Sequence, residues 1–292
     1  MDARARDLLT RSDGSTEVVG EATVLARIDY LAGYVLTELS VTPSADTTLL
    51  IHRPVSAGFR AAVAEALPDD RDRSSLLHLL LDDMPGAALV SGYVMGREGV
   101  VLKREGKFSL QMVNMCAGWR EGGTIVVERE RHPDGMVPTV TGPVSGSVER
   151  PDDPLAWHLF SDPLPAHGVR RRRRLDVVAG DPVSLDVFFR DSHMSQEGEE
   201  TSIHEYTVDA TVDQSSMTFR TIAAQARALP WMECIEAADS GSWLTGRPLE
   251  ELRTKVRKEF TGIETCTHLN DTLRSLEDAV ALIGALDRLA SS

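Results

Sequence analysis

Three side chains that lie far apart in the sequence, His204, Cys234 and Cys266, are of types that bind metal ions or transfer protons. Apolar and polar residues alternate over 203–212, which places His204 on the apolar face of a strand. Cys234 stands where a helical pattern starts, and Cys266 precedes or opens the last helix. A helix N-terminus stabilises a thiolate, so both cysteines are suited to a lowered pKa or to a soft metal ion. We therefore expect the three residues to meet in one site.

Each of these residues also has a purely structural interpretation. A histidine on an apolar face is often a core residue that is hydrogen-bonded to the backbone, and most free cysteines act as small apolar side chains. His268 would point about 200° away from Cys266 around a shared helix. These two side chains can therefore bind one metal ion only if the helix begins after Cys266.

Further polar residues stand beside the same strands. Asp191 and His193 follow a strand that contains two phenylalanines, and Glu205 adjoins His204. The next residues, 194–201, have the composition of a loop, so a polar turn also explains Asp191 and His193 and is favoured by the local sequence. In the functional interpretation His204 is a general base or metal ligand held by Glu205 or Asp191. His193 is then a second acid/base group.

Composition and charge exclude several classes of protein. A net charge of −14, from 45 acidic and 31 basic residues, opposes a general nucleic-acid binder, because such proteins neutralise phosphate charges. The basic run 170–174 is therefore interpreted as a set of intramolecular ion pairs or a strand-edge feature. No apolar run approaches the roughly 20 residues that span a bilayer, and the N-terminal residues do not resemble a secretory signal. Three cysteines are too few for a disulfide framework. We expect a cytoplasmic protein with neither a membrane nor a nucleic-acid partner.

Short motifs of well-known sites are absent from the sequence. There is no pair of cysteines or histidines at zinc-binding spacing, no phosphate-binding loop and no G-x-S-x-G. A G-x-G-x-x-G after a strand is also missing, which argues against a Rossmann domain and a nucleotide cofactor.

The chain divides into three zones that differ in composition and in secondary-structure pattern. Residues 1–114 mix strand and helix patterns, 115–169 are rich in glycine and proline and are expected to form a loop-rich connector, and 170–292 carry the candidate site. The following strands are expected: 21–30, 34–41, 87–94, 124–130, 175–178, 184–190, 203–212 and 218–229. Helices are expected at 59–67, at 76–84 with an end at Pro85, and at 234–244, 248–260 and 267–286.

A hairpin followed by two helices occurs at both ends of the chain, in 17–84 and in 202–290. This order predicts an α+β fold, with an antiparallel sheet covered by helices on one face, in two weakly similar halves.

The strings HEYTVDATVD (204–213), LPWMEC (229–234) and TCTHLNDTLRSL (265–276) together resemble the bacterial family known as domain of unknown function 2889. The actinobacterial branch is also similar in LLLDDMPGAALVSGY (79–93), CAGW (116–119), DPLAWH (153–158), RRRRLDV (171–177) and FRDSH (189–193). The family has no settled activity, so the resemblance implies site residues rather than a reaction. Those residues are Asp191, His193, His204, Glu205, Cys234, Cys266 and His268.

A hairpin, a cysteine-bearing turn into a helix and a late cysteine that opens the last helix are also similar to the U-type iron–sulfur cluster scaffold. This second resemblance implies that Cys234 and Cys266 converge near the end of the hairpin, with His204 or a nearby acid as a further ligand.

From these residues we expect an enzyme that acts on a small apolar or aromatic catabolic intermediate by lyase, hydratase or isomerase chemistry. The alternative is a metal-binding or iron–sulfur-scaffold-like protein, with a single Zn or Fe ion bound by His204, Cys234 and Cys266. The expected partners are a small-molecule substrate and a second copy of the chain in a homodimer.

Overall fold

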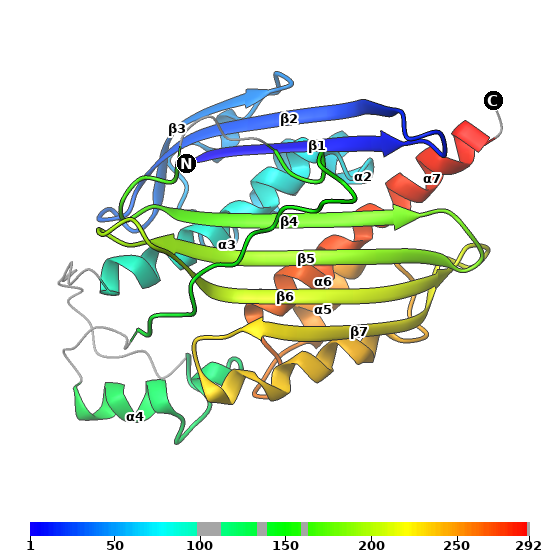
Figure 1. Ribbon diagram of the computed structural model, residues 1–292. Coiled ribbons are helices and arrows are strands. Elements are labelled where there is room, and N and C mark those ends of the chain that lie inside the picture. Colours follow the sequence, from blue (N-terminus) through cyan, green and yellow to red (C-terminus); the bar gives the residue numbers. More distant parts are fainter. Residues whose placement is uncertain (98–111, 133–138, 159–162, 291–292) are drawn as a thin grey trace. The chain divides into compact units, whose positions relative to one another are not determined.

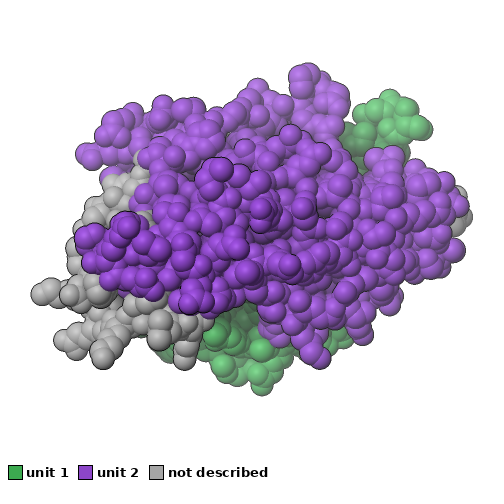
Figure 2. Space-filling view, turned by 90° about the horizontal axis from the view of Figure 1, so that it is seen from below, with its two compact units in different colours: residues 1–89 green, residues 90–292 purple. Residues whose placement is uncertain are grey.

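The computed structural model describes residues 1–97, 112–132, 139–158 and 163–290 (Figure 1). The chain forms two compact units, Met1–Leu89 and Val90–Ser292, which are coloured separately in Figure 2. The division falls earlier than the expected boundary at residue 114. It does so because Val90 and Val94 pack in a small apolar cluster with Ile203 of the second unit.

Unit 1 is a three-stranded antiparallel sheet with helices on one face. Its strands are β1 (Asp2–Thr10), β2 (Thr16–Asp29) and β3 (Val35–Thr42), in the order β1-β2-β3. Its helical segments are η1 (Thr48–Leu50), α1 (Phe59–Ala66), α2 (Pro68–Asp72) and the first part of α3 (Leu76–Arg97). The predicted hairpin is confirmed as β2 and β3.

The prediction for α3 was wrong. We expected this helix to end at Pro85 and a strand to follow, but α3 continues through Pro85. A proline inside a helix removes one backbone hydrogen bond. Apolar burial at helical spacing offsets that loss, since Leu77, Leu81, Met84 and Ala88 all lie in the core of unit 1.

Unit 2 is built on a four-stranded antiparallel sheet in the order β4-β5-β6-β7. The strands are β4 (Val169–Val178), β5 (Val183–Met194), β6 (Glu200–Asp213) and β7 (Thr218–Ala228). The later helical segments are η4 (Met232–Cys234), η5 (Glu236–Leu244), α5 (Leu252–Glu259), α6 (Thr267–Ser275), η6 (Leu276–Asp278) and α7 (Ala279–Ala290). Figure 1 shows α5, α6 and α7 on one side of this sheet, which we call its inner face.

The inner face of the sheet carries the core of unit 2. Phe189, Tyr206 and Val208 point inward from β5 and β6, and Leu269 and Leu273 of α6 pack in the same cluster. The alternation in β6 is therefore confirmed. Two antiparallel sheets, each with helices, confirm the predicted α+β class and its two halves.

The expected loop-rich connector contains regular structure. Residues 117–119 form η3 (Ala117–Trp119), and 124–131 form α4 (Thr124–Arg131) where we expected a strand. The Glu233 carboxylate accepts hydrogen bonds from the Thr124 N–H (2.7 Å) and hydroxyl (2.8 Å). A carboxylate at this position stabilises a helix N-terminus. The β-branched residues that suggested a strand include Ile125 and Val126, which are buried on one side of the helix.

A second part of the connector, residues 143–157, crosses the opposite side of the sheet, and we call it the strap. Near its start the Ser202 N–H donates to the Pro143 carbonyl (2.9 Å), and the Ser145 N–H donates to that of Glu200 (2.8 Å). Further along, Trp157 lies edge-on to Phe188, with 5.4 Å between ring centroids. We call the side of the sheet that carries the strap its outer face.

In the described part of the chain we find no helix with the length and apolar character that a membrane crossing demands.

Candidate functional site

The pairing of β5 with β6 brings Asp191 opposite His204 on the inner face. The two side chains are almost completely buried, with 0% of Asp191 and 6% of His204 exposed. The local sequence favoured a polar turn at Asp191 and His193, and this prediction was wrong, since both residues belong to β5. A β-bulge follows, because Asp191 pairs with His204 while Ser192 pairs with Ser202, which leaves Ile203 as an extra residue in β6.

Arg171 of β4 holds Asp191 in place. It lies opposite Asp191 in the register and donates from Nε to Oδ1 (2.7 Å) and from Nη2 to Oδ2 (2.9 Å). Its Nη1 also reaches Oδ2 of Asp271 in α6 at 3.3 Å. A two-point arginine–carboxylate pair fixes orientation as well as charge. The Asp191 carboxylate is therefore held in a fixed orientation beside His204, whose Nδ1 lies 3.9 Å from Oδ2.

The N-terminus of α6 supplies the other half of the cluster. The helix begins at Thr267, and the backbone of Cys266 is extended, so the condition under which Cys266 and His268 can face one site is met. His268 Nδ1 lies 3.9 Å from Cys266 Sγ. The His268 ring stacks on that of His204, with centroids 3.5 Å apart and planes inclined by 18°. We call Arg171, Asp191, His204, His268 and Cys266 the buried cluster.

The surroundings shift the pKa values of these groups in opposite directions. Burial, the neighbouring His268 and Arg171 hold the pKa of His204 well below its usual value. Burial acts the same way on His268, but the hydrogen bond and charge of Cys266, together with Asp191, outweigh it and raise the pKa of His268. For Cys266, burial alone would raise the pKa, but His268, the Tyr206 hydroxyl and the Leu269 N–H reverse that effect and lower it. The shifts thus favour a neutral His204 and move Cys266 and His268 toward the thiolate and the imidazolium.

The remaining thiols lie around the same helix end. Burial and the nearby Cys266 raise the pKa of Cys116 to about 11, and burial, Cys266 and Cys116 raise that of Cys234 further. Tyr206 is fully buried among the three sulfurs, and burial together with their charge raises its pKa well above the usual value. Of the three thiols, Cys266 alone is shifted toward its anion.

The structure brings some of the predicted residues together and separates others. Asp191, His204 and Cys266 meet in the buried cluster. Cys234 lies outside this cluster but close enough to Cys266 for the charge of Cys266 to raise its pKa. Glu205 does not hold His204, because it lies on the outer face and accepts a 2.6 Å hydrogen bond from Arg190 Nε. Successive strand residues face opposite sides, which explains this separation.

Other residues were placed incorrectly or missed. His193 is fully buried two residues beyond Asp191, where it pairs with Thr201. Sequence reasoning missed Arg171, Tyr206 and Cys116 as site residues. The ion-pair interpretation of the basic run was the one available signal for Arg171, and it is confirmed by the contacts of Arg171 with Asp191 and Asp271.

The geometry offers donor atoms for a metal ion but is not arranged around one. Single donor atoms of Asp191, His204 and His268 lie within 4.8 Å of one another. Both Asp191 oxygens already accept hydrogen bonds from Arg171. Nearly parallel imidazole rings also aim their in-plane lone pairs alongside one another rather than at a common point. Hydrogen bonding and proton transfer suit this arrangement better.

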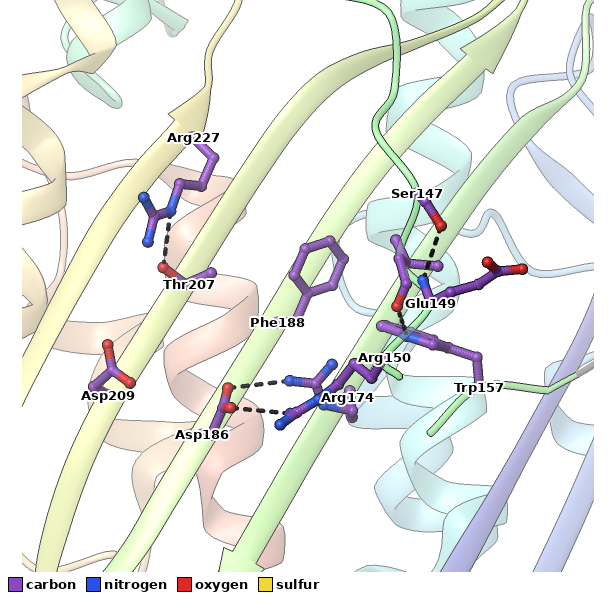
Figure 3. A pocket seen from close by; sticks show the side chains of 11 residues that line it. Ser147, Glu149, Arg150, Trp157, Arg174, Asp186, Phe188, Thr207, Asp209 and Arg227 are labelled. Carbon is purple, nitrogen blue, oxygen red and sulfur yellow. Dashed lines mark hydrogen bonds and ion pairs between the residues drawn. The ribbon is translucent and has the colours of Figure 1, made fainter. Parts of the chain in front are cut away.

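The outer face holds a groove with a volume of about 400 Å³ (Figure 3). Figure 3 shows Arg150 of the strap and Arg174 of β4 both directed at Asp186, with Trp157 beside them. None of the buried cluster lines this groove. His268 is the partly exposed histidine of the cluster.

Comparison with known proteins gives a family and no activity. No curated protein and no solved structure matches the chain. Residues 169–282 contain the whole buried cluster, and they match the family model described as a protein of unknown function (DUF2889), which confirms the resemblance over that segment.

Proposed function

We propose that unit 2 is an enzyme that transfers protons on a small molecule, with Cys266 and His268 as the reacting pair. One observation carries the proposal: Cys266 Sγ faces His268 Nδ1 at 3.9 Å, at the N-terminus of α6. A thiolate held by an imidazolium and a helix N-terminus is an activated base or nucleophile. The opposite pKa shifts of the two groups support the same assignment.

Asp191 and His204 act as positioning residues in this proposal. Asp191 raises the pKa of His268, and the neutral His204 ring stacks on the imidazolium. Arg171 orients the carboxylate through two hydrogen bonds. This assignment moves the acid/base role that the sequence suggested for His204 to its stacking partner.

The apolar surroundings of the pair support a small apolar or aromatic substrate. Leu269 and Phe189 belong to the core that encloses it. Lyase, hydratase and isomerase reactions need a base and an acid near one carbon centre, which a thiolate and an imidazolium supply.

A cytoplasmic location and a homodimer are part of the same proposal. Size-exclusion chromatography with light scattering tests the homodimer.

The pH dependence of thiol alkylation tests the reacting pair without a known substrate. Iodoacetamide labelling, followed by peptide mass spectrometry, should give Cys266 a midpoint below the usual thiol value, whereas Cys116 should titrate near 11. His268→Asn should raise the midpoint of Cys266, and the matched variant Cys234→Ser should leave it unchanged. A Cys266 midpoint equal to that of Cys116 would contradict the proposal.

Turnover tests the catalytic claim itself. A panel of small apolar and aromatic acids, enols and unsaturated acids is incubated with the full chain and followed by NMR. On any substrate found, Cys266→Ala and His268→Asn should lower kcat by about 100-fold or more, the usual contribution of a positioned acid or base. If either variant keeps full kcat, that residue has no catalytic role.

A metal centre is the second candidate, favoured by the proximity of the Asp191, His204 and His268 donor atoms. Elemental analysis of the purified protein separates the two candidates. A stoichiometric Zn or Fe that is lost in His204→Ala would favour the metal centre, and an alkylation profile unaffected by a chelator would favour the thiolate pair.

A further inference from the structure

All three cysteines of the chain lie in one region, although they come from three distant segments. Cys116 precedes η3, Cys234 ends η4, and Cys266 stands directly before α6. Their convergence is not explained by the proton-transfer proposal, which uses Cys266 alone.

Cys116 and Cys266 are joined through their neighbours. The Ala117 N–H donates to the Thr265 carbonyl at 2.9 Å, so each cysteine is one residue away from a backbone hydrogen bond that ties the two segments together. The Thr267 N–H, at the first residue of α6, also contributes to the environment of the Cys116 sulfur. The Cys116 thiol therefore lies against the helix end at which Cys266 stands.

Cys234 approaches the same segment from another side. Its sulfur is so close to Gly118 that a Cβ at this glycine would lie 3.1 Å away. Among the described residues, the backbone hydrogen bond of Cys234 runs to Trp231 and not to the α6 segment. Of the two neighbouring thiols, we take Cys116 as the partner of Cys266, because its segment is hydrogen-bonded to the residue before Cys266.

The thiols lie only one layer below the surface. Their residues are 8%, 6% and 4% exposed for Cys116, Cys234 and Cys266. Met115, directly before Cys116, is 41% exposed, and Met232, two residues before Cys234, is 79% exposed. A small oxidant needs little local opening to reach this region.

We propose that Cys116 and Cys266 form a reversible intramolecular disulfide when the protein meets a hydroperoxide. The Cys266 thiolate attacks the peroxide O–O bond, which breaks as an S–O bond forms, and an alcohol or water leaves after taking up a proton. The Cys116 sulfur then attacks the sulfenic acid of Cys266. The S–S bond forms, the S–O bond breaks, and the departing hydroxide leaves as water with the Cys116 proton. Two thiols lose two electrons in total, and the hydroperoxide gains them.

This inference does not depend on the proposed enzymatic function, because disulfide formation needs only the two sulfurs and an oxidant. If the enzymatic proposal is also right, oxidation removes the reacting thiolate and stops turnover until a reductant restores it.

Disulfide mapping of the full chain tests the inference. The protein is treated with hydrogen peroxide, alkylated, digested without reductant and analysed by mass spectrometry. The expected product is a crosslinked peptide containing Cys116 and Cys266, lighter by two hydrogens than its separate parts and released by dithiothreitol. Cys234→Ser should keep this product. Cys116→Ser should lose it and give a sulfenic acid at Cys266 that dimedone traps.

Three outcomes would overturn the inference. They are a bond from Cys266 to Cys234 in the wild-type chain, a disulfide found only between two chains, and peroxide treatment that leaves Cys266 either unmodified or overoxidised with no crosslink. Mapping of the wild-type protein decides between them, so the result holds even if a variant fails to fold.

Discussion

The two faces of the four-stranded sheet use the same ion pair in different surroundings. On the inner face, Arg171 and Asp191 have side chains that are 7% and 0% exposed. On the outer face, Arg174 and Asp186 have side chains that are 12% and 48% exposed, and Arg150 of the strap shares the same aspartate. Both pairs join β4 to β5, so the difference lies in hydration and in what the carboxylate contacts next.

The comparison indicates which pair is structural and which serves a site. The outer aspartate contacts two arginines and is half exposed, an arrangement that joins the strap to the sheet. The inner aspartate faces a histidine whose ring stacks on a second one. Burying an ion pair seldom adds stability over an apolar pair. The presence of Arg171 and Asp191 in the core therefore needs another explanation, and the positioning of the histidines that we propose is one.

The largest effect is expected from Asp191→Asn. Removing this charge takes from the buried guanidinium of Arg171 the carboxylate that it contacts at two points. The free energy of unfolding of unit 2 should fall by about 3–5 kcal/mol, as when one partner of a buried pair is lost. Urea denaturation followed by tryptophan fluorescence measures this, because all four tryptophans lie in 90–292. A loss no larger than that of the outer-face variant Asp186→Asn would remove the distinction between the faces.

A smaller loss is expected from Gly142→Ala, at the start of the strap. A Cβ at this position would lie 1.6 Å from the Ser202 carbonyl oxygen, so the strap must shift. We expect a cost of about 1–3 kcal/mol, typical of overpacking. Hydrogen exchange should become faster at the amides of Ser145 and Ser202, which hold the strap to β6. Gly146→Ala is the matched control, because a Cβ there meets no atom within 4 Å. Equal exchange in the two variants would contradict the proposed anchoring.

The histidine pair should make stability depend on pH in two opposite ways. The pKa of His204 is lowered in the folded state, so the unfolded chain binds more protons below pH 6.5 and acid reduces stability. His204→Gln should remove that loss, which amounts to at most about 1.4 kcal/mol per pH unit for one proton.

His268 should behave in the opposite sense. Its pKa is raised in the folded state, so its contribution is complete below pH 6.5 and is lost as the pH rises through the folded value. His268→Gln should therefore differ most from wild type at acid pH. Urea denaturation at several pH values checks both statements. Parallel pH profiles for the two variants would show that the rings are not perturbed in opposite directions.

The smallest effect is expected from Asp186→Asn on the outer face. Arg174 keeps Asp176 as a partner at 2.9 Å, and Arg150 keeps Asp152 and Asp176. The cost should be about 0–1 kcal/mol, as for other partly exposed pairs, and should shrink further in high salt. A loss of stability above that range, and unchanged by salt, would show that the outer ion pairs contribute to stability as much as the inner pair.

Local patterns predicted the elements whose burial follows a simple period. Alternation placed His204, Tyr206 and Val208 on one face of β6, and the structure has them there. The pattern failed at Pro85, where burial of a long apolar stripe outweighs one lost hydrogen bond. It failed again in α4, where the helix depends on a carboxylate more than 100 residues away.

The candidate site was only partly predictable for a similar reason. Asp191 and His204 are brought together by the register of β5 and β6. His268 joins them because α6 begins at Thr267, after Cys266. Arg171 and Cys116 enter through contacts between distant segments. No periodicity in one sequence encodes such contacts.

The extra residue in β6 has a consequence for sequence change in this segment. Ile203 is unmatched in the pairing with β5, and its side chain packs with Val90, Val94 and Val169. A chain with this one residue deleted would keep Ser202 and His204 on the sides they now occupy, because the deletion restores simple alternation. It would lose only the apolar anchor for the last turns of α3. Deletion at this point should therefore be tolerated by the histidine pair, whereas deletion of the next residue would remove His204 and put Ile203 opposite Asp191 in its place.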